Sequence, residues 1–204
     1  KEEAHLLTPV EGSCPIASLL PAEPSIAFST VPFQSRHGVG YVAGWMAGAT
    51  SPNADGLRWF VSEVLPLVVS RIPWVRLYVT GANPPTDLLE LAGPNVVFEG
   101  HVADIAEFYG APRVVISPIR FGAGVKVKTV QALQYGVPIV ATTCGAEGIS
   151  QGGIPAIEVA DEAGAFADRL VTLLTEPTEW EASRARIAEV VSCWQHDTSS
   201  SSWP

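Results

Sequence analysis

Basic residues are scarce in this sequence. Only 12 of its 204 residues are Lys or Arg, against 21 Asp and Glu, and the formal net charge at pH 7 is −9. Proteins that bind nucleic acid or anionic membranes through a general surface need a broad basic face. The charge balance therefore argues against both partners, and any site for a phosphate group must be local.

Cysteines and long apolar runs are also few. The three cysteines, Cys14, Cys144 and Cys193, are widely spaced, show no metal-ligand pairing and cannot all pair with one another, which favours a reducing, cytoplasmic setting without a bound metal. Charge, Pro or Gly interrupts every apolar stretch well before the ~20 residues that span a bilayer, and no secretory apolar segment follows Lys1. We expect no transmembrane segment. The start at Lys1 without Met suggests that the sequence is part of a longer protein. That longer protein could contact the inner face of the membrane peripherally.

The composition is that of a folded domain. Apolar residues make up 47% of the chain and charged residues 16%, as in globular proteins. From Val39 onward, short β-branched runs alternate with longer segments of helical periodicity. The predicted strands are Val39–Ala43, Val75–Thr80, Val96–Phe98, Val114–Ser117, Val137–Ala141 and Ala156–Val159. The predicted helices are Asn53–Ser70 with a kink at Pro66, Thr86–Ala92, Asp104–Tyr109, Val125–Tyr135, Asp161–Thr175 and Thr178–Val191.

This alternation predicts an α/β fold with a doubly wound, mostly parallel sheet and helices on both faces. The ligand of such a fold lies beyond the carboxyl ends of the strands. Residues 38–192 are expected to form this Rossmann-like domain. Residues 1–37 are interpreted as a linker or remnant of a preceding region, with at most one strand among apolar runs such as Ser25–Val31, and residues 193–204 as a frayed tail.

The turn after the fourth predicted strand combines the features of an anion site. Gly122 and Gly124 let the backbone come close to a ligand, and the free N–H groups at the start of the next helix point to the same place. Arg120, Lys126 and Lys128 gather there on a chain that is poor in cations. A diphosphate is the matching ligand. The alternative, solvated surface cations beside an ordinary turn, is equally open on physical grounds.

Two familiar phosphate motifs do not occur. The Gly-x-Gly-x-x-Gly fingerprint would need a glycine where Val127 stands, and the Gly-Lys-Ser/Thr of the Walker loop is missing. This argues against a dinucleotide-binding oxidoreductase domain.

Three further polar residues are candidates for ligand contact. Gln131 lies three residues after Lys128 and shares its helix face, so it could reach a sugar hydroxyl. Glu147, in the loop after the fifth predicted strand, could do the same, and His101 stands in another strand-to-helix loop whose backbone could meet a base or phosphate. Each also has a plain structural interpretation: an exposed polar side chain, a contact with a helix N-terminus and a structural histidine, respectively.

In their order and spacing these segments resemble the C-terminal domain of the family-four glycosyltransferases, from about Gly38 to Val191. The motifs that carry the resemblance are Ser-Pro-Asn-Ala-Asp-Gly-Leu (51–57) with Val64–Pro66, Leu77–Gly81, Val97–Val102 with Asp104, Pro118–Lys128, Gln131–Leu133 with Gly136–Pro138, and Ala141–Thr142 with Gly145–Gly148. The resemblance implies the C-terminal half of an enzyme of GT-B fold. Such enzymes retain anomeric configuration and use a nucleotide-sugar donor, with no cofactor and no metal at the donor phosphates.

The same resemblance implies three groups of site residues, without a catalytic residue. They are the donor diphosphate residues Arg120, Gly122, Ala123, Gly124, Lys126 and Lys128, the ribose and base residues Gln131, His101 and Val102, and a donor-sugar loop of Gly145, Ala146, Glu147 and Gly148. The implied partners are a nucleotide-diphosphate sugar and a saccharide or lipid acceptor. The acceptor would be bound by an N-terminal domain that residues 1–37 cannot supply, so the chain alone is expected to be inactive.

The sequence departs from the family pattern in two ways. Many members have two glutamates eight positions apart, where this chain has Ala123 and Gln131. The loop after the first strand usually offers an Arg and a Lys to phosphate, and residues 44–56 contain neither. These departures keep a second function open: a degenerate, non-catalytic Rossmann-like module that serves for interaction.

Overall fold

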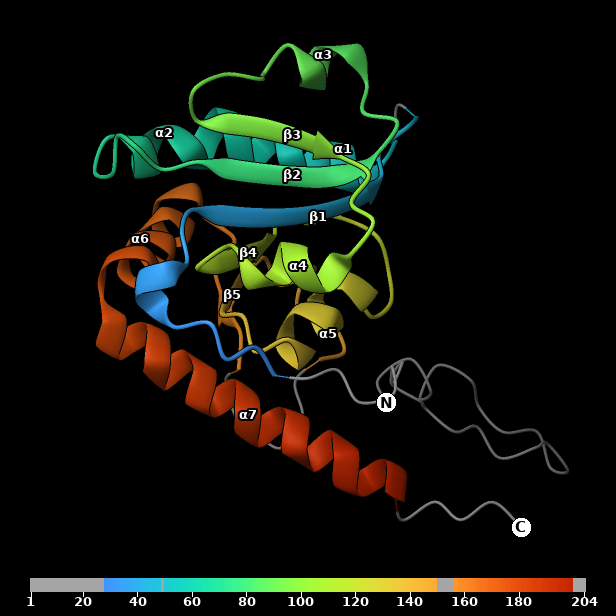
Figure 1. The fold of residues 1–204 in the computed structure, drawn as a ribbon. Helices are drawn as coiled ribbons and strands as arrows, with labels where there is room; N and C mark the ends of the chain where they lie inside the picture. Colours follow the sequence, from blue (N-terminus) through green and yellow to red (C-terminus); the bar gives the residue numbers. More distant parts are fainter. Residues whose placement is uncertain (1–27, 49, 150–155, 200–204) are drawn as a thin grey trace, which may run out of the picture.

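A six-stranded sheet forms the centre of the protein in the computed structural model, which describes residues 28–48, 50–149 and 156–199 (Figure 1). The strands are β1 (Val39–Trp45), β2 (Leu77–Ala82), β3 (Val96–Gly100), β4 (Val114–Ser117), β5 (Ile139–Ala141) and β6 (Glu158–Val159). Neighbouring strands are parallel, in the order β3-β2-β1-β4-β5-β6. The predicted α/β class with a parallel sheet is confirmed, and each predicted strand is present.

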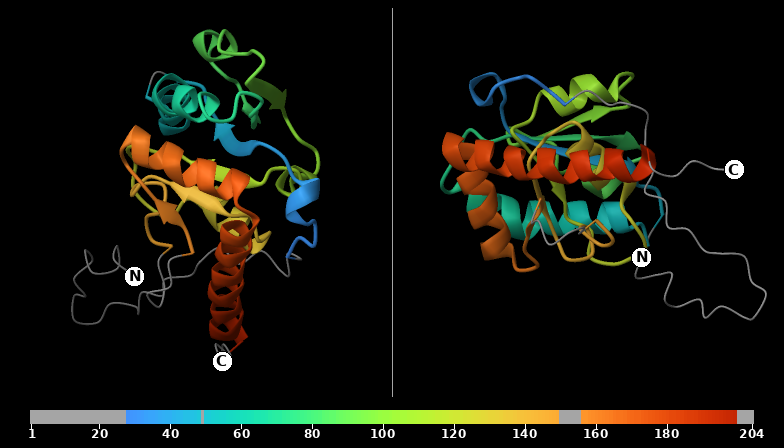
Figure 2. Two further views of the ribbon diagram at one scale, coloured as in Figure 1. Left: turned by 90° about the vertical axis from the view of Figure 1, so that its left-hand side faces the viewer. Right: turned by 90° about the horizontal axis from the view of Figure 1, so that it is seen from below.

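Helices cover both faces of this sheet (Figure 2). They are α1 (Pro52–Trp59), α2 (Leu65–Val69), α3 (Thr86–Leu89), α4 (Ile105–Gly110), α5 (Val127–Gln134), α6 (Ala163–Thr175) and α7 (Pro177–Ser199). One apolar core joins α1, α2 and α6 to the sheet, and a second joins α4, α5 and α7. Strand β4 shows the division, because Val114 and Ile116 belong to the first core and Val115 to the second. Such alternation is typical of a strand that is buried on both faces.

The predicted helix Asn53–Ser70 is present but irregular. Ser51 caps its start by accepting a hydrogen bond from a first-turn N–H at 3.3 Å, and Pro52 occupies the first helical position. A π-helical turn, η3 (Phe60–Val64), separates α1 from α2. Pro66 has no N–H with which to bond to the preceding turn. The wider π-helical turn lies just ahead of it, where the regular α-helical hydrogen bonds are interrupted. The helix is therefore irregular just ahead of Pro66, where the sequence predicts a kink.

Residues 28–37 pack against the domain and are part of it. The guanidinium of Arg36 is buried, with 1% of the residue exposed, and donates to the carbonyl oxygens of Tyr109 and Pro112, both at 2.9 Å. Phe33, also buried, packs edge-to-face against an α7 tryptophan. Residues 28–37, which are interpreted from the sequence as part of a linker, therefore pack as part of this domain. The partners of Arg36 lie 73 and 76 residues away, so no local pattern reveals them.

The two ends of the chain differ from the prediction in one more respect each. Residues 28–31 of the run Ser25–Val31 form no strand, and residues 25–27 lie outside the described part of the chain. At the other end, α7 continues through 193–199, which corrects the predicted frayed tail over those residues. The reason is the buried Trp194, which joins the second apolar core. Residues 200–204 lie outside the described part.

Candidate functional site

The order of strands reverses at the carboxyl ends of β1 and β4. Strand β1 pairs with both β2 and β4, and it leads to α1 on one face of the sheet, whereas β4 leads to α5 on the other. The loops that follow β1 and β4 therefore part at this point, and open α/β sheets bind their ligands where such loops part. The structure places six predicted diphosphate residues in loop 118–126 and the first turn of α5: Arg120, Gly122, Ala123, Gly124, Lys126 and Lys128.

Lys126 braces this turn from within. Its Nζ donates to the carbonyl oxygen of Gly124 at 2.5 Å and to that of Gly122 at 3.3 Å, and it lies 3.2 Å from Oε2 of Glu147. The two glycines have φ angles of +87° and +109°, in the left-handed region that favours glycine. Only 12% of the Lys126 side chain is exposed. A predicted diphosphate cation and a predicted donor-sugar residue thus form one ion pair between two loops.

Gly145 lets the loop after β5 touch the end of β4. A Cβ at this position would lie 2.1 Å from the carbonyl oxygen of Ser117, the last residue of β4. Thr129 of α5 completes the contact, since its hydroxyl lies 2.9 Å from Ser117 Oγ and 3.2 Å from the carbonyl oxygen of Gly145. The sequence marks Gly145 as part of a ligand loop, and the structure adds a packing role that depends on the approach of a distant strand.

Lys128 ties α5 to β1 and α1. Its Nζ donates to Oδ1 of Asn53 and lies 3.5 Å from the carbonyl oxygen of Ala43 and 5.2 Å from the ring centroid of Tyr41. Burial, and then the nearby charge of Lys126, lower the pKa of Lys128 to about 8. The amine of Lys128 therefore already has protein acceptors at the end of β1 and on α1. Asn53 and Tyr41 were not identified from the sequence as neighbours of Lys128. The only sign of them in the sequence is that each carries a polar group in or after an apolar predicted strand.

Replacing Lys128 with methionine should flatten the pH dependence of stability between pH 8 and 10.5. The pKa of Lys128 is about 8 in the folded protein and has an ordinary value of 10.5. The unfolded chain therefore binds the proton more strongly, and the free energy of unfolding of the wild type rises with pH through this window, by about 3 kcal/mol. Methionine carries no proton and removes that rise. Urea unfolding at several pH values measures both slopes, and equal slopes would contradict the lowered pKa.

Arg120 leaves its guanidinium half-exposed at the same turn. Its side chain is 49% exposed, and its Nε lies 3.4 Å from Oδ2 of Asp55 on α1. The Asp55 Oδ2 atom is buried and has no hydrogen-bond partner among the described residues, whereas the guanidinium faces water. The guanidinium of Arg120 is therefore available to an incoming anion.

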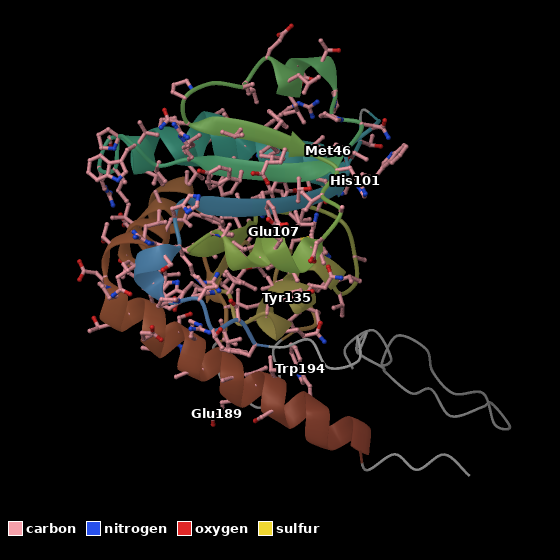
Figure 3. All side chains as sticks on the ribbon, in the orientation of Figure 1. Met46, His101, Glu107, Tyr135, Glu189 and Trp194 are labelled. Carbon is pink, nitrogen blue, oxygen red and sulfur yellow. The ribbon has the colours of Figure 1, made fainter. Side chains whose placement is uncertain are left out.

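The structure gathers some predicted site residues and separates others. It brings the turn 120–128 together with the loop residues Gly145, Ala146, Glu147 and Gly148. Gln131 is half-buried on α5, beyond Lys128. His101 and Val102 follow β3, which β2 and β1 separate from β4. Figure 3 shows His101 at the same end of the sheet as Met46, which directly follows β1. His101 and Val102 therefore lie at the carboxyl end of the sheet, two strands away from the turn 120–128.

Within 28–48, 50–149 and 156–199, no group of three or more His, Cys, Asp or Glu side chains is placed to hold a metal ion. No helix in that same part of the chain is both long and apolar enough to cross a membrane.

Known proteins share this fold and part of this sequence. The family model described as glycosyl transferases group 1 matches residues 41–176. An uncharacterized 44.6 kDa protein in the cps region of Klebsiella pneumoniae is 24% identical over 128 residues, which are 58% of this chain and 33% of that protein. The C-terminal domain of a glycosyl transferase group 1 family protein (LpcC) from Francisella tularensis has a TM-score of 0.60 at 18% identity, over 80% of this chain and 87% of that chain.

A larger solved structure also matches this chain over only part of its own length. A mutant of S. aureus TarM in complex with fondaparinux, alpha-GlcNAc-glycerol and UDP has a TM-score of 0.59 at 14% identity. The match covers 87% of this chain and 37% of TarM. The chain therefore spans about a third of the length of TarM and of the Klebsiella relative.

Proposed function

The chain belongs to the glycosyl transferases group 1 family, whose model matches residues 41–176, and from that membership we propose that it is the donor-binding domain of a glycosyltransferase. In this proposal it holds a nucleotide-diphosphate sugar, whose sugar passes to a saccharide or lipid acceptor. A separate N-terminal domain binds the acceptor, which agrees with the small share of TarM that this chain covers.

One observation carries the proposal: the anion-binding features of turn 120–128 meet at the carboxyl ends of β1 and β4. Helix α5 begins at Val127, and the first amides of a helix have no intrahelical acceptor, so they and the helix dipole favour an anion. Arg120 adds a half-exposed guanidinium from the same loop. Gly122 keeps the backbone open there, since a Cβ at 122 would meet only Pro52, at 3.7 Å. A diphosphate carries the charge that these groups match.

The same residues suit a leaving diphosphate. As the bond between the sugar and the diphosphate breaks, negative charge builds on the diphosphate, and fixed donors that already point there stabilise it. Arg120 and the α5 amides supply those donors. Lys126 and Lys128 add positive potential from behind the turn, because protein oxygens hold both amines in place. The UDP in the TarM complex supports a nucleoside diphosphate as the class of ligand.

A second candidate function is a non-catalytic interaction module. The observation in its favour is that both buried cations of the turn are already engaged with protein oxygens, and that neither Ala123 nor Gln131 supplies a carboxylate. Such a domain would keep the fold and lose the donor.

Titration with nucleoside diphosphates separates the two functions. The purified chain should bind UDP, GDP or ADP with a Kd on the order of 0.1–1 mM, equal to a binding free energy of roughly −5.5 to −4 kcal/mol. Thermal shift and isothermal calorimetry measure it, with NAD as the comparison ligand. Binding of none of the three diphosphates would favour the interaction module. The chain alone should transfer no sugar to an acceptor panel, because in this proposal a separate N-terminal domain is needed to position the acceptor hydroxyl, and robust turnover would contradict the two-domain arrangement.

Replacing Gln131 with glutamate should tighten nucleoside-diphosphate binding. A carboxylate accepts stronger, charge-assisted hydrogen bonds from ribose hydroxyls than an amide does. The gain should be about 1 kcal/mol, or roughly fivefold in Kd. Gln34→Glu is the matched control, because Gln34 is an exposed residue far along the chain from the site. Weaker binding by Gln131→Glu alone would show that the added charge repels the diphosphate.

A further inference from the structure

A cavity opens between the loops after β4 and β5, helix α1 and the segment that joins β6 to α6. Its volume is about 240 Å³, and its lining residues are Trp59, Ile119, Arg120, Thr142, Cys144 and Asp161. Helices α1 and α6 belong to the first apolar core, and α5 belongs to the second. The wall of the cavity that α1 forms therefore lies on the opposite face of the sheet from α5, whose first turn belongs to the proposed diphosphate site. The volume of the cavity falls just below the roughly 300–1,000 Å³ of pockets for drug-sized ligands, which suits a single sugar ring.

Trp59 gives this cavity an aromatic wall. The residue is half-buried, and its ring packs edge-to-face with Phe166 at a centroid distance of 5.5 Å, which fixes its position. An indole offers a flat apolar surface and carries its polar group on one edge only. The C–H face of a sugar ring can pack against such a surface while its hydroxyls remain free for polar partners.

Asp161 is the hydrogen-bond acceptor of the cavity, and it is held in place. Its Oδ1 accepts from the backbone N–H of Thr143 at 2.8 Å, and its Oδ2 accepts from the Thr143 hydroxyl at 2.6 Å. Each carboxylate oxygen has a further lone pair, and the residue is exposed. Asp161 is therefore oriented in advance and can still accept from a ligand hydroxyl.

The balance of charge selects a neutral, hydroxyl-rich ligand. Arg120 and Asp161 are the two charged residues of the lining, so an anion would meet the carboxylate and a cation the guanidinium. A sugar hydroxyl can donate to Asp161 and accept from Arg120. Thr142 and Cys144 already bond to loop carbonyls, with the Cys144 thiol 3.1 Å from the carbonyl oxygen of Gly122. They shape the cavity.

We propose that this cavity is a subsite for one neutral sugar ring, separate from the Gly145–Gly148 loop. The inference rests on the proposed function, which brings a sugar to this end of the sheet either on the donor or on the acceptor. Since Arg120 lines the cavity and also belongs to the diphosphate turn, the two sites share one side chain.

Protection of Cys144 from alkylation tests the subsite. The chain is treated with iodoacetamide, and the rate at Cys144 is followed by peptide-resolved mass spectrometry. The additions are methyl glycosides of glucose, galactose, mannose and N-acetylglucosamine, then UDP-glucose and GDP-mannose, with glycerol as the non-specific control. At least one sugar compound should slow the reaction threefold or more at saturation. Asp161→Asn should abolish the protection, and Asp168→Asn, within α6 and paired with Arg71, should keep it.

The outcomes separate the source of the sugar and the two proposals. Protection by a methyl glycoside identifies an acceptor-type sugar, and protection by a nucleotide sugar but by no glycoside identifies the sugar of the donor. Protection by neither, or protection that survives Asp161→Asn, overturns the subsite. UDP affinity is measured on the same sample: binding of UDP without protection overturns only the subsite. Protection without UDP binding overturns the donor function and supports the subsite.

Discussion

Replacing Gly145 with alanine should lower the free energy of unfolding by about 3 kcal/mol, the upper end of the usual cost of overpacking. The new Cβ would lie 2.1 Å from the carbonyl oxygen of Ser117 and 2.9 Å from its Oγ. That carbonyl cannot retreat cheaply, since it also accepts from Thr142 N–H at 3.2 Å and Ser117 pairs with Ala141 in the sheet. The midpoint of thermal unfolding should fall by roughly 6–12 °C.

Gly164→Ala is the matched control for this substitution. Gly164 lies in α6, and a Cβ there would meet nothing within 4 Å. Alanine in a helix avoids the conformational entropy that glycine loses, so this variant should gain roughly 0.5–1 kcal/mol. Chemical denaturation of both variants measures the contrast. Equal stability of Gly145→Ala and wild type would mean that the loop after β5 does not press against β4 in solution.

Reversing the charge of Arg120 should weaken nucleoside-diphosphate binding at least about tenfold, or about 1.4 kcal/mol. Arg120→Glu removes the half-exposed cation of the turn and sets a carboxylate beside Asp55 and the incoming phosphates. The fold should survive, because the side chain is half in solvent. Lys128→Glu is a poorer test of binding, since it would place a buried carboxylate against the carbonyl of Ala43 and the amide oxygen of Asn53.

Arg71→Glu is the control for Arg120→Glu. The side chain of Arg71 is also 49% exposed and also pairs with an aspartate, Asp168. It lies between α2 and β2, ahead of the amino end of a strand and so away from the turn. Calorimetric titration with UDP compares the two variants at the same net charge. A similar loss of affinity in both would reduce the effect to overall charge and remove the diphosphate from turn 120–128.

Local pattern was sufficient to locate the strands, but not all of their ends. Strand β4 has the predicted bounds, because a buried parallel strand reads as an unbroken apolar run. The predicted starts at Val137 and Ala156 were each two residues early, since both residues are buried without being in the sheet. Strand β1 runs two residues beyond Ala43, past a register shift at Gly44 that no alternation of apolar residues predicts.

The turn 120–128 could be predicted from its glycines and cations, but the contacts of those cations could not. Lys128 meets Asn53 across 75 residues, and Lys126 meets Glu147 across 21. Such pairs depend on the order of strands, which brings the ends of β1, β4 and β5 side by side. Arg36 is the same case on a larger scale. Composition marks where charge is concentrated, and only the topology decides whether that charge faces a ligand or a carbonyl group.

The buried Arg36 also decides which part of the chain moves with the sheet. Its guanidinium joins the hydroxyl of Ser29, at 2.6 Å, to the carbonyls of Tyr109 and Pro112, and it stays charged at neutral pH because burial lowers its pKa only to about 10. Arg184 of α7 donates to the carbonyl of Ser29 as well. Residues 29–36 thus move with the sheet as one rigid body. Any movement of this domain therefore carries residues 29–36 and turn 120–128 together, with no pivot between them.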